Sequence, residues 1–455
     1  MRLPSFLAVY RDRRLLTILL LGFSSGLPLA LTGATLTVWL TEAKLPMAVI
    51  GLFLLARLPY SLKFLWAPLI DRARLPWLTR RFGRRRGWAL LTQGALMLAL
   101  LALSGCDPVA APWVMAAMAL LVAFASASQD VVVDAYRVES LDQAQFGAGA
   151  ATYVLGYRLG MLISGAGALY LASVLSWPEV YVAMAAAVLV GVATILLAPE
   201  PGDAATAALL AREHAAATAL ALSRGLTGRR ARVAAWFYGA VVAPLRDFML
   251  HPAWLAILLF ITLFKLGEVF AAGMVNPFYL GLGFSKVEIA SVTKVFGLGA
   301  TIAGGLIGGV LVARLGINRG LLVTGTLQMV SNLAYVALAY AGHDIAMLMA
   351  SVAAENISAG MATAAFVAYL SSLCSVAYTA TQYALLTSLT GIGRDLFAAG
   401  SGFAAEQLGW VPFFLLATAL CLPGLGLLLW LSASPPRPVP LRDELAAALP
   451  AESGE

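Results

Sequence analysis

The residues of this chain that are best suited to chemistry are ionisable side chains inside long apolar stretches. Asp130 and Asp134 are four residues apart and are followed by Arg137, so all three lie along one face of a helix. Two close carboxylates resist simultaneous ionisation, which makes such a pair a natural place to take up and release a proton. Asp130 is therefore a candidate proton carrier. Asp134 fits that role and fits equally well a structural pairing with Arg137.

Further acidic residues occur in later apolar stretches. Lys265 and Glu268 are three residues apart, and this spacing predicts an ion pair within one helix. Such a pair needs no function to explain it, but a substrate or proton that competes for one partner would bias a transporter between two states. Glu355 is another acid within an apolar stretch and joins Asp130, Asp134 and Glu268 as a candidate for proton coupling.

Cationic and amide side chains in the same stretches are candidates for binding a solute. Arg158, Lys294 and Arg394 could hold an anionic group, because a guanidinium binds a carboxylate with two donors and an ammonium acts as a point charge. Asn356 and Gln382 could bond to hydroxyl groups. The same amides serve equally well to hold helices together.

Enzyme chemistry is the weaker alternative. The run Gly22–Gly26 matches the nucleophile pattern G-x-S-x-G, but a serine nucleophile needs a base, and all three histidines fall in connections outside the apolar stretches. No zinc-binding or nucleotide-binding motif occurs. The three cysteines are far apart and lack the spacing of a disulfide framework or a metal site. The sequence thus predicts no enzyme, no metal site and no cofactor.

Membrane-spanning helices must position these side chains. The 455 residues are 61% hydrophobic and only 12% charged, with a mean hydropathy of +0.87, which excludes an ordinary water-soluble globule. Only helices and closed barrels satisfy backbone polar groups in lipid, and a helix needs about 20 apolar residues to cross. Twelve stretches qualify: 15–40, 48–70, 87–105, 112–135, 147–173, 179–198, 253–280, 287–313, 320–340, 345–373, 380–404 and 411–431.

The distribution of basic residues predicts the orientation of these spans. The net charge of +7 lies in short blocks between apolar runs, which favours membrane orientation over nucleic-acid binding. With a cytoplasmic N-terminus, only Lys44 and Lys286 fall in outer connections. We therefore expect both termini in the cytoplasm, and we expect Lys63 to extend toward the inner membrane face.

Two basic, glycine-flanked loops indicate an internal duplication. Gly83–Gly87 follows the second predicted span, and Gly316–Gly320 follows the eighth. The prediction is an all-α membrane protein with twelve transmembrane helices, a major facilitator fold with two pseudo-symmetric six-helix halves. We expect the first loop to take part in conformational change through Asp71, Arg72, Arg84 and Arg85.

The predicted divisions follow from this architecture. They are an N-terminal bundle at 1–198, a cytoplasmic linker at 199–252, a C-terminal bundle at 253–431 and a cytoplasmic tail at 432–455. The linker is either solvated or contains an amphipathic helix on the membrane surface around Arg229–Tyr238. Small-residue spacing predicts close helix contacts at Gly156, Gly160, Gly304, Gly305, Gly308 and Gly309.

A set of short motifs in both halves resembles the AmpG-type muropeptide permeases of the major facilitator superfamily. These motifs are Gly22–Thr32, Lys63–Leu69, Asp71–Arg72, Gly83–Trp88, Ser126–Asp130, Asp134–Ala135, Gly147–Ala151, Leu155–Met161, Ala243–Phe248, Lys265–Gly267, Glu355–Asn356, Ala380–Gln382 and Gly393–Arg394. The set is far more specific than any of its members.

This resemblance implies a function. Such permeases import disaccharide and disaccharide-peptide cell-wall fragments containing 1,6-anhydro-N-acetylmuramic acid across the bacterial inner membrane, driven by the proton gradient. They serve peptidoglycan recycling and, in some species, beta-lactamase induction. By this resemblance, Arg158, Lys265, Lys294 and Arg394 would meet stem-peptide carboxylates. Sugar hydroxyls would meet Gln129, Asn356 and Gln382.

The resemblance also defines the expected partners. We expect a monomer in contact with membrane lipid that binds a small glycopeptide and no nucleic acid, with the proton gradient in place of a cofactor. The alternative is a transporter of the same fold that moves another solute, such as a peptide, a lipid or a drug.

Overall fold

The fold was described from a computed structural model. The structure describes residues 12–201, 215, 238–251, 253–285, 288–289, 291–375 and 378–433. The regular secondary structure of these residues is helical throughout. Ten of their helices are long and apolar enough to cross a membrane. The chain is therefore a multi-pass integral membrane protein with an all-helical fold.

Ten candidate spans account for most of the described chain. In the first part they are α1–α2 (Arg13–Leu31 and Ala34–Glu42), α7 (Arg84–Ser104), α8 (Pro112–Ser140), η4 through α10 (Gln143–Gln145, α9 Phe146–Leu162, η5 Ile163–Gly167 and α10 Ala168–Ala172), and α11–α12 (Trp177–Ala187 and Leu189–Leu197). In the second part they are α16–α18 (Trp254–Leu263, Leu266–Ala272 and Val275–Gly281), η7–α20 (Ser291–Phe296 and Gly297–Leu315), α21 (Ile317–Ala341), α22 (Ile345–Ser372), and α24–α25 (Trp410–Ala419 and Leu422–Ala433).

The two other predicted spans have a different character. The stretch 48–70 is divided into α3 (Met47–Phe53), η2 (Leu54–Arg57), α4 (Leu58–Leu62), η3 (Lys63–Leu65) and α5 (Ala67–Arg72). Pro59 and Pro68 lie in the first turns of α4 and α5, where proline is tolerated and where it ends the preceding helix. The stretch 380–404 lies in α23 (Thr379–Leu408), a continuous helix of 30 residues. Neither is among the ten candidate spans.

Three short elements lie in the connections. They are α6 (Leu78–Phe82), η6 (Tyr238–Val242) and α15 (Ala243–Met249). The surface helix predicted around Arg229–Tyr238 lies outside the described residues except for Tyr238, which begins η6.

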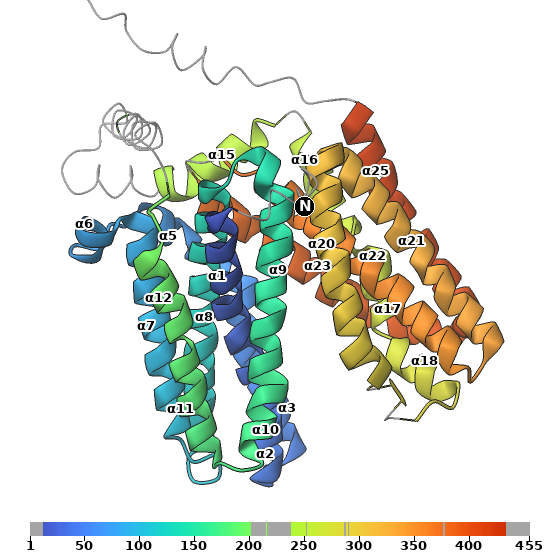
Figure 1. The fold of residues 1–455 in the computed structure, drawn as a ribbon, viewed down its shortest axis with the longest axis horizontal. Coiled ribbons are helices and arrows are strands. Elements are labelled where there is room, and N and C mark those ends of the chain that lie inside the picture. The colour runs from blue at the N-terminus through green and yellow to red at the C-terminus, as the bar shows by residue number, and fades with distance from the viewer. Residues whose placement is uncertain are drawn as a thin grey trace, which may run out of the picture.

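The helices are arranged in sequence order. Figure 1 shows α1 through α12 gathered on one side of the molecule and α16 through α25 on the other, with α9 and α20 where the two groups meet. Contacts of α9 with α20 and α22, and of α8 with α23, join the two groups. Below, the two groups are called the N-terminal and C-terminal bundles.

A constant offset relates helices of the two bundles. α7 begins at Arg84 and α21 at Ile317, which is 233 residues further along, and the same offset separates the first residues of α8 and α22, of α9 and α23, and of α11 and α24. Gly83 and Gly316, which precede α7 and α21, have nearly the same backbone angles, with φ of 93° and 79°. The left-handed region favours glycine, so the predicted repeat of glycine-flanked loops has a conformational basis.

Glycines bring helix backbones into direct contact within each bundle. A Cβ on Gly26 of α1 would collide with the carbonyl oxygen of Tyr157, and a Cβ on Gly160 of α9 with that of Phe23. In the C-terminal bundle, Gly304 and Gly308 of α20 meet the backbone of α22 in the same way. The predicted close helix contacts are confirmed at these glycines, and Gly156 belongs to the same α1–α9 contact.

The hydrophobic core is shared between the bundles at one end only. One cluster of buried residues lies within 27–188 and another within 270–417, so each is confined to one bundle. Two further clusters combine residues of both bundles, among them Leu15 and Phe146 with Val312 and Leu386. Leu15 and Phe146 lie where α1 and α9 begin, and Val312 lies where α20 ends. The bundles therefore pack together at this end, the upper end in Figure 1.

Candidate functional site

The predicted pair of aspartates on α8 lies in a buried ionic cluster. The Asp134 carboxylate is 3.8 Å from Lys63 Nζ and 3.5 Å from Arg137 Nη2. All three side chains are at most one-tenth exposed. The expectation that Lys63 extends to the membrane face is wrong. It overlooked that the irregular backbone of 47–72 packs against α8, so the buried ammonium meets a carboxylate instead.

Asp130 lies one turn before Asp134 and has no such partner. It is 7% exposed, and its Oδ1 atom is buried without a hydrogen-bond partner among the described residues. Lys63 and Asp134 are within electrostatic range. A buried carboxylate that is not held in an ion pair is free to gain or lose a proton, which fits the role expected for Asp130.

Arg137 connects this cluster to the other bundle. Its Nη1 atom donates a hydrogen bond to Ser371 Oγ of α22 at 2.9 Å. Its guanidinium also lies 5.4 Å from the ring centre of Tyr153 and 5.1 Å from that of Tyr383, so two aromatic faces from different bundles flank the cation. Arg137 thus links Asp134 to the interface between the two bundles.

A second polar cluster lies in the C-terminal bundle. Lys265 Nζ donates hydrogen bonds to Glu268 Oε2 and to Thr363 Oγ1, so the spacing of three residues gives the ion pair it predicts. Glu355 lies within electrostatic range of Lys265 and Glu268, and Arg158 of α9 is in range from the other bundle. Arg158, Lys265, Glu268 and Glu355 are thereby brought into one neighbourhood.

The three predicted hydroxyl-binding amides are engaged with the protein. Gln129 Nε2 donates to Ser24 Oγ of α1 at 3.1 Å, and Asn356 Oδ1 accepts from Thr301 Oγ1 of α20 at 2.7 Å. Gln382 lies at the start of α23, where it bonds to the backbone of Ser375 and to residues of α15. The side chains of Lys294 and Arg394 lie outside the described part of the structure.

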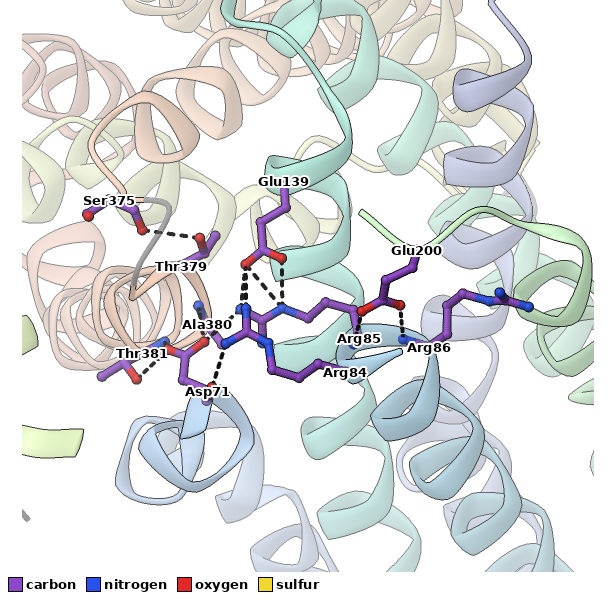
Figure 2. A network of polar contacts seen from close by, with 10 residues as sticks. All are labelled: Asp71, Arg84, Arg85, Arg86, Glu139, Glu200, Ser375, Thr379, Ala380 and Thr381. Carbon is purple, nitrogen blue, oxygen red and sulfur yellow. Dashed lines mark hydrogen bonds and ion pairs between the residues drawn. The ribbon is translucent and has the colours of Figure 1, made fainter. Parts of the chain in front are cut away.

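The loop predicted to act in conformational change forms a dense ionic network (Figure 2). The guanidinium of Arg85, which is fully buried, binds Glu139 through Nε and Nη2 and binds Asp71 Oδ1 through Nη2 at 2.7 Å. Arg84 donates to the backbone oxygen of Asp71 at 2.7 Å and lies 3.7 Å from Glu139. The residues Asp71, Arg84 and Arg85 are therefore brought together by the fold.

Asp71 carries this network across to the C-terminal bundle. Its Oδ2 atom accepts hydrogen bonds from the backbone N–H and the hydroxyl of Thr381, both at 2.7 Å, and its Oδ1 atom accepts from Ala380 N–H at 3.2 Å. These are the first free N–H groups of α23, so the carboxylate caps that helix and faces the positive end of its dipole. Arg72 lies over the ring of Tyr378, 5.9 Å from its centre.

Two acids that complete the network were missed by the sequence analysis. Glu139 lies near the end of α8, and Glu200 accepts hydrogen bonds from the backbone N–H groups of Arg85 and Arg86 at 2.7 and 2.9 Å. Burial raises the pKa of Glu200 above its ordinary value. Both acids lie outside the predicted spans, where a charge needs no explanation. In the sequence, only their position just after predicted membrane spans could have indicated them.

Comparison with known proteins decides the family. The sequence model of the Major Facilitator Superfamily matches residues 18–394. The chain belongs to this superfamily. The Anhydromuropeptide permease of Escherichia coli (strain K12) is 42% identical over 427 residues, covering 93% of this chain and 81% of that protein. Putative transporter AmpG 4 of Rickettsia felis is 35% identical over 426 residues, covering 93% and 98%.

Within the superfamily, these identities place the chain among the AmpG-type permeases. A solved structure of the proton:xylose symporter XylE bound to 6-bromo-6-deoxy-D-glucose has the same fold, with a TM-score of 0.63 at 13% identity over 94% of this chain and 96% of that chain. The protein is a transporter of this superfamily and not an enzyme.

Proposed function

We propose that this AmpG-type permease is a proton-coupled importer of anhydromuropeptides, GlcNAc-1,6-anhydroMurNAc with or without a stem peptide, for peptidoglycan recycling. The name of the Escherichia coli permease and its 42% identity support the substrate class. The observation that carries the coupling is the position of Asp130, a buried carboxylate that forms no ion pair with the described residues and lies beside the cluster of Lys63, Asp134 and Arg137.

The architecture that we propose has twelve transmembrane helices in two pseudo-symmetric halves. The offset of 233 residues between helix starts supports a duplication. The irregular stretch 47–72 and α23 would supply the second and eleventh helices. Both termini would face the cytoplasm, at the inner membrane, because the basic loops gather on that side.

In this orientation the contacts between the bundles close the cytoplasmic side. Asp71 with Thr381, Arg137 with Ser371, and Gly147 beside Val312 all lie at helix ends on that side. Each bundle has its own separate core toward the other side. Import would therefore require these contacts to break after substrate and proton bind, and a proton on Asp130 or Asp134 would weaken the hold of the cluster on Arg137.

The substrate would bind between the two polar clusters. Arg158 and Lys265 are the described cations available to a stem-peptide carboxylate, and Lys294 and Arg394 remain proposed partners. Protonation of Glu268 or Glu355 would release Lys265 for this purpose. Gln129, Asn356 and Gln382 remain the proposed partners of the sugar hydroxyls. Each amide makes one or more bonds within the protein, and the Oε1 atom of Gln129 is buried without a partner among the described residues.

Uptake of labelled GlcNAc-1,6-anhydroMurNAc into right-side-out vesicles tests the proposed substrate. We expect accumulation that a protonophore abolishes and that unlabelled disaccharide and disaccharide-tripeptide compete away. Accumulation that survives the protonophore would overturn proton coupling. Absence of uptake and of competition in functional vesicles would instead favour another solute of the same fold.

A further inference from the structure

The short helix α15 has no role in the transport cycle proposed above. It ends the connection between the bundles, directly before the first helix of the C-terminal bundle. Phe248 anchors it, since this ring is 3% exposed and belongs to the core cluster that spans both bundles. The preceding turn, η6, contacts α5 of the N-terminal bundle, and α15 itself contacts α23. The segment 238–249 therefore touches both partners of the Asp71 contact.

Gln382 fastens α15 to α23 with every polar atom of its side chain. Its Oε1 atom accepts from Ser375 N–H at 2.7 Å, which ties Ser375 to the first turn of α23. Its Nε2 atom donates to the backbone oxygen of Pro244 at 3.1 Å and to Asp247 Oδ2 at 2.9 Å, both on α15. The amide is 2% exposed, so water cannot replace these partners.

Gln382 directly follows the two residues that Asp71 binds. The backbone N–H groups of Ala380 and Thr381 must point at the Asp71 carboxylate for the bundles to stay joined at this place. A side chain that holds the next residue of the same turn from two directions fixes the direction of those N–H groups. Burial raises the pKa of Asp247. Gln382 donates a hydrogen bond to this carboxylate, so replacing Gln382 would leave a buried acceptor without that donor.

We infer that Gln382 is a positioning residue of the inner gate: by tying α15 and Ser375 to the start of α23, it holds the N–H groups of Ala380 and Thr381 where Asp71 closes the cytoplasmic side. The inference deepens the proposed function and rests on its cytoplasmic assignment of this end. Through this tie, the connection between the bundles helps to set the equilibrium between the outward-facing and inward-facing states.

Cys374 offers a native reporter of this gate. It is half-buried, next to Ser375, within electrostatic range of Arg137 and Asp71. In a chain with Cys106→Ser and Cys421→Ala, the rate at which N-ethylmaleimide alkylates Cys374 in inverted vesicles reports opening of the cytoplasmic side. This measurement needs no substrate, so failure of the inference is distinguishable from failure of the proposed substrate.

Two variants weaken the tie from opposite sides. Gln382→Met keeps the side-chain length without hydrogen bonding. Asp247→Leu removes the side-chain acceptor on α15 and leaves the carbonyl of Pro244 as the remaining one. We expect each to raise the alkylation rate of Cys374 roughly fivefold, the factor for about 1 kcal/mol. In right-side-out vesicles each should raise the KM for uptake while the maximal rate changes little, because the outward-facing state that binds external substrate is less populated.

Two further variants are the controls. Asp247→Asn keeps an acceptor for Gln382 and should behave as the parent chain, as should Met249→Ala, which removes an exposed side chain from the same helix. Thermal melting of the purified variants establishes folding, and Asp247→Leu carries the test if Gln382→Met does not fold. Unchanged alkylation and KM in the folded variants would overturn the inference. So would an equal rise in Met249→Ala, which would mean general loosening of α15.

Discussion

Asp130 and Asp134 are one helical turn apart on α8 and have different surroundings. Asp134 is held by Lys63 and Arg137, whereas Asp130 has a buried oxygen without a partner among the described residues. The spacing in the sequence put both acids on one face and left their roles open. The structure separates them, because the packing of 47–72 onto α8 brings Lys63 into an ion pair with Asp134, whereas Asp130 lies only within electrostatic range of it.

The first prediction concerns the acid left free. Asp130→Asn keeps the shape and the hydrogen-bonding capacity of the side chain and removes the exchangeable proton. The rate of uptake driven by an imposed pH gradient should fall by about tenfold or more, which corresponds to about 1.4 kcal/mol in the activation free energy of transport. Exchange of internal for external substrate at equal pH should persist, because it needs no net proton movement. Full gradient-driven uptake in Asp130→Asn would remove this residue from the coupling site.

The second prediction concerns the buried guanidinium of Arg85. Arg85→Met removes the cation that binds the buried carboxylates of Asp71 and Glu139 directly and leaves only Arg84 near Glu139, which costs about 3–5 kcal/mol. The free energy of unfolding, measured by denaturant titration in detergent, should fall by that amount. Arg80→Met is the matched control, because Arg80 is exposed on α6 and the change should be small. Equal stability of the two variants would contradict the role of Arg85.

Residue types alone did not distinguish a side chain that faces a solute from one that holds helices together. The amides of Asn356 and Gln382 lie in apolar sequence, and each bonds a neighbouring segment in the structure. Lys63 was misjudged for the same reason, because its partner comes from a helix far away in the sequence. The ion pair of Lys265 and Glu268 was predictable, since both residues lie on one helix.

At the scale of helices, the apolar stretches predicted the elements well. The ten candidate spans coincide with predicted ones to within a few residues at most ends. The stretch 48–70 forms several short helices, because Pro59 and Pro68 divide it, and its place as a span stays a proposal. Close helix contacts were predictable from glycine spacing, since glycine alone admits a backbone at such a distance.

The third prediction tests the backbone contact between α1 and α9. Gly26→Ala introduces a Cβ that would collide with the carbonyl oxygen of Tyr157, a rigid group, so the helices must separate. We expect a loss of about 1–3 kcal/mol in unfolding free energy, the range of overpacked cores. Gly94→Ala in α7 is the matched control, because nothing lies within 4 Å of its added Cβ, and it should be neutral or stabilising. A melting temperature that falls equally in both variants would refute the contact.

At the scale of the whole molecule, a constant offset relates the helices but not the polar clusters that they carry. The offset of 233 residues relates helix starts and the glycines before α7 and α21, and it relates Trp177 to Trp410. It does not relate the buried acid of α8 to a second acid, because Thr363 is the residue 233 positions after Asp130. The helices that share the offset therefore carry two different polar clusters, one on α8 and one around Lys265. Only the fold shows which residues of each cluster come together.

The fourth prediction tests the closed end of the molecule. A Cβ on Gly147 of α9 would lie 2.7 Å from the Cβ of Val312 on α20, close enough for a disulfide after a small shift. Oxidation of the double variant Gly147→Cys/Val312→Cys should abolish uptake, and reductant should restore it, whereas each single variant should be insensitive to oxidant. Full uptake by the oxidised double variant would mean that these ends do not part during transport.

The central claim is that movement of the solute and of a proton is one event controlled by the ionic cluster on α8. Proteoliposomes loaded with a pH-sensitive dye measure it directly when GlcNAc-1,6-anhydroMurNAc is added outside without an imposed gradient. The account predicts that the lumen acidifies as the labelled disaccharide enters, and that Asp130→Asn abolishes the acidification. Entry of the disaccharide at the full rate with an unchanged internal pH would contradict it.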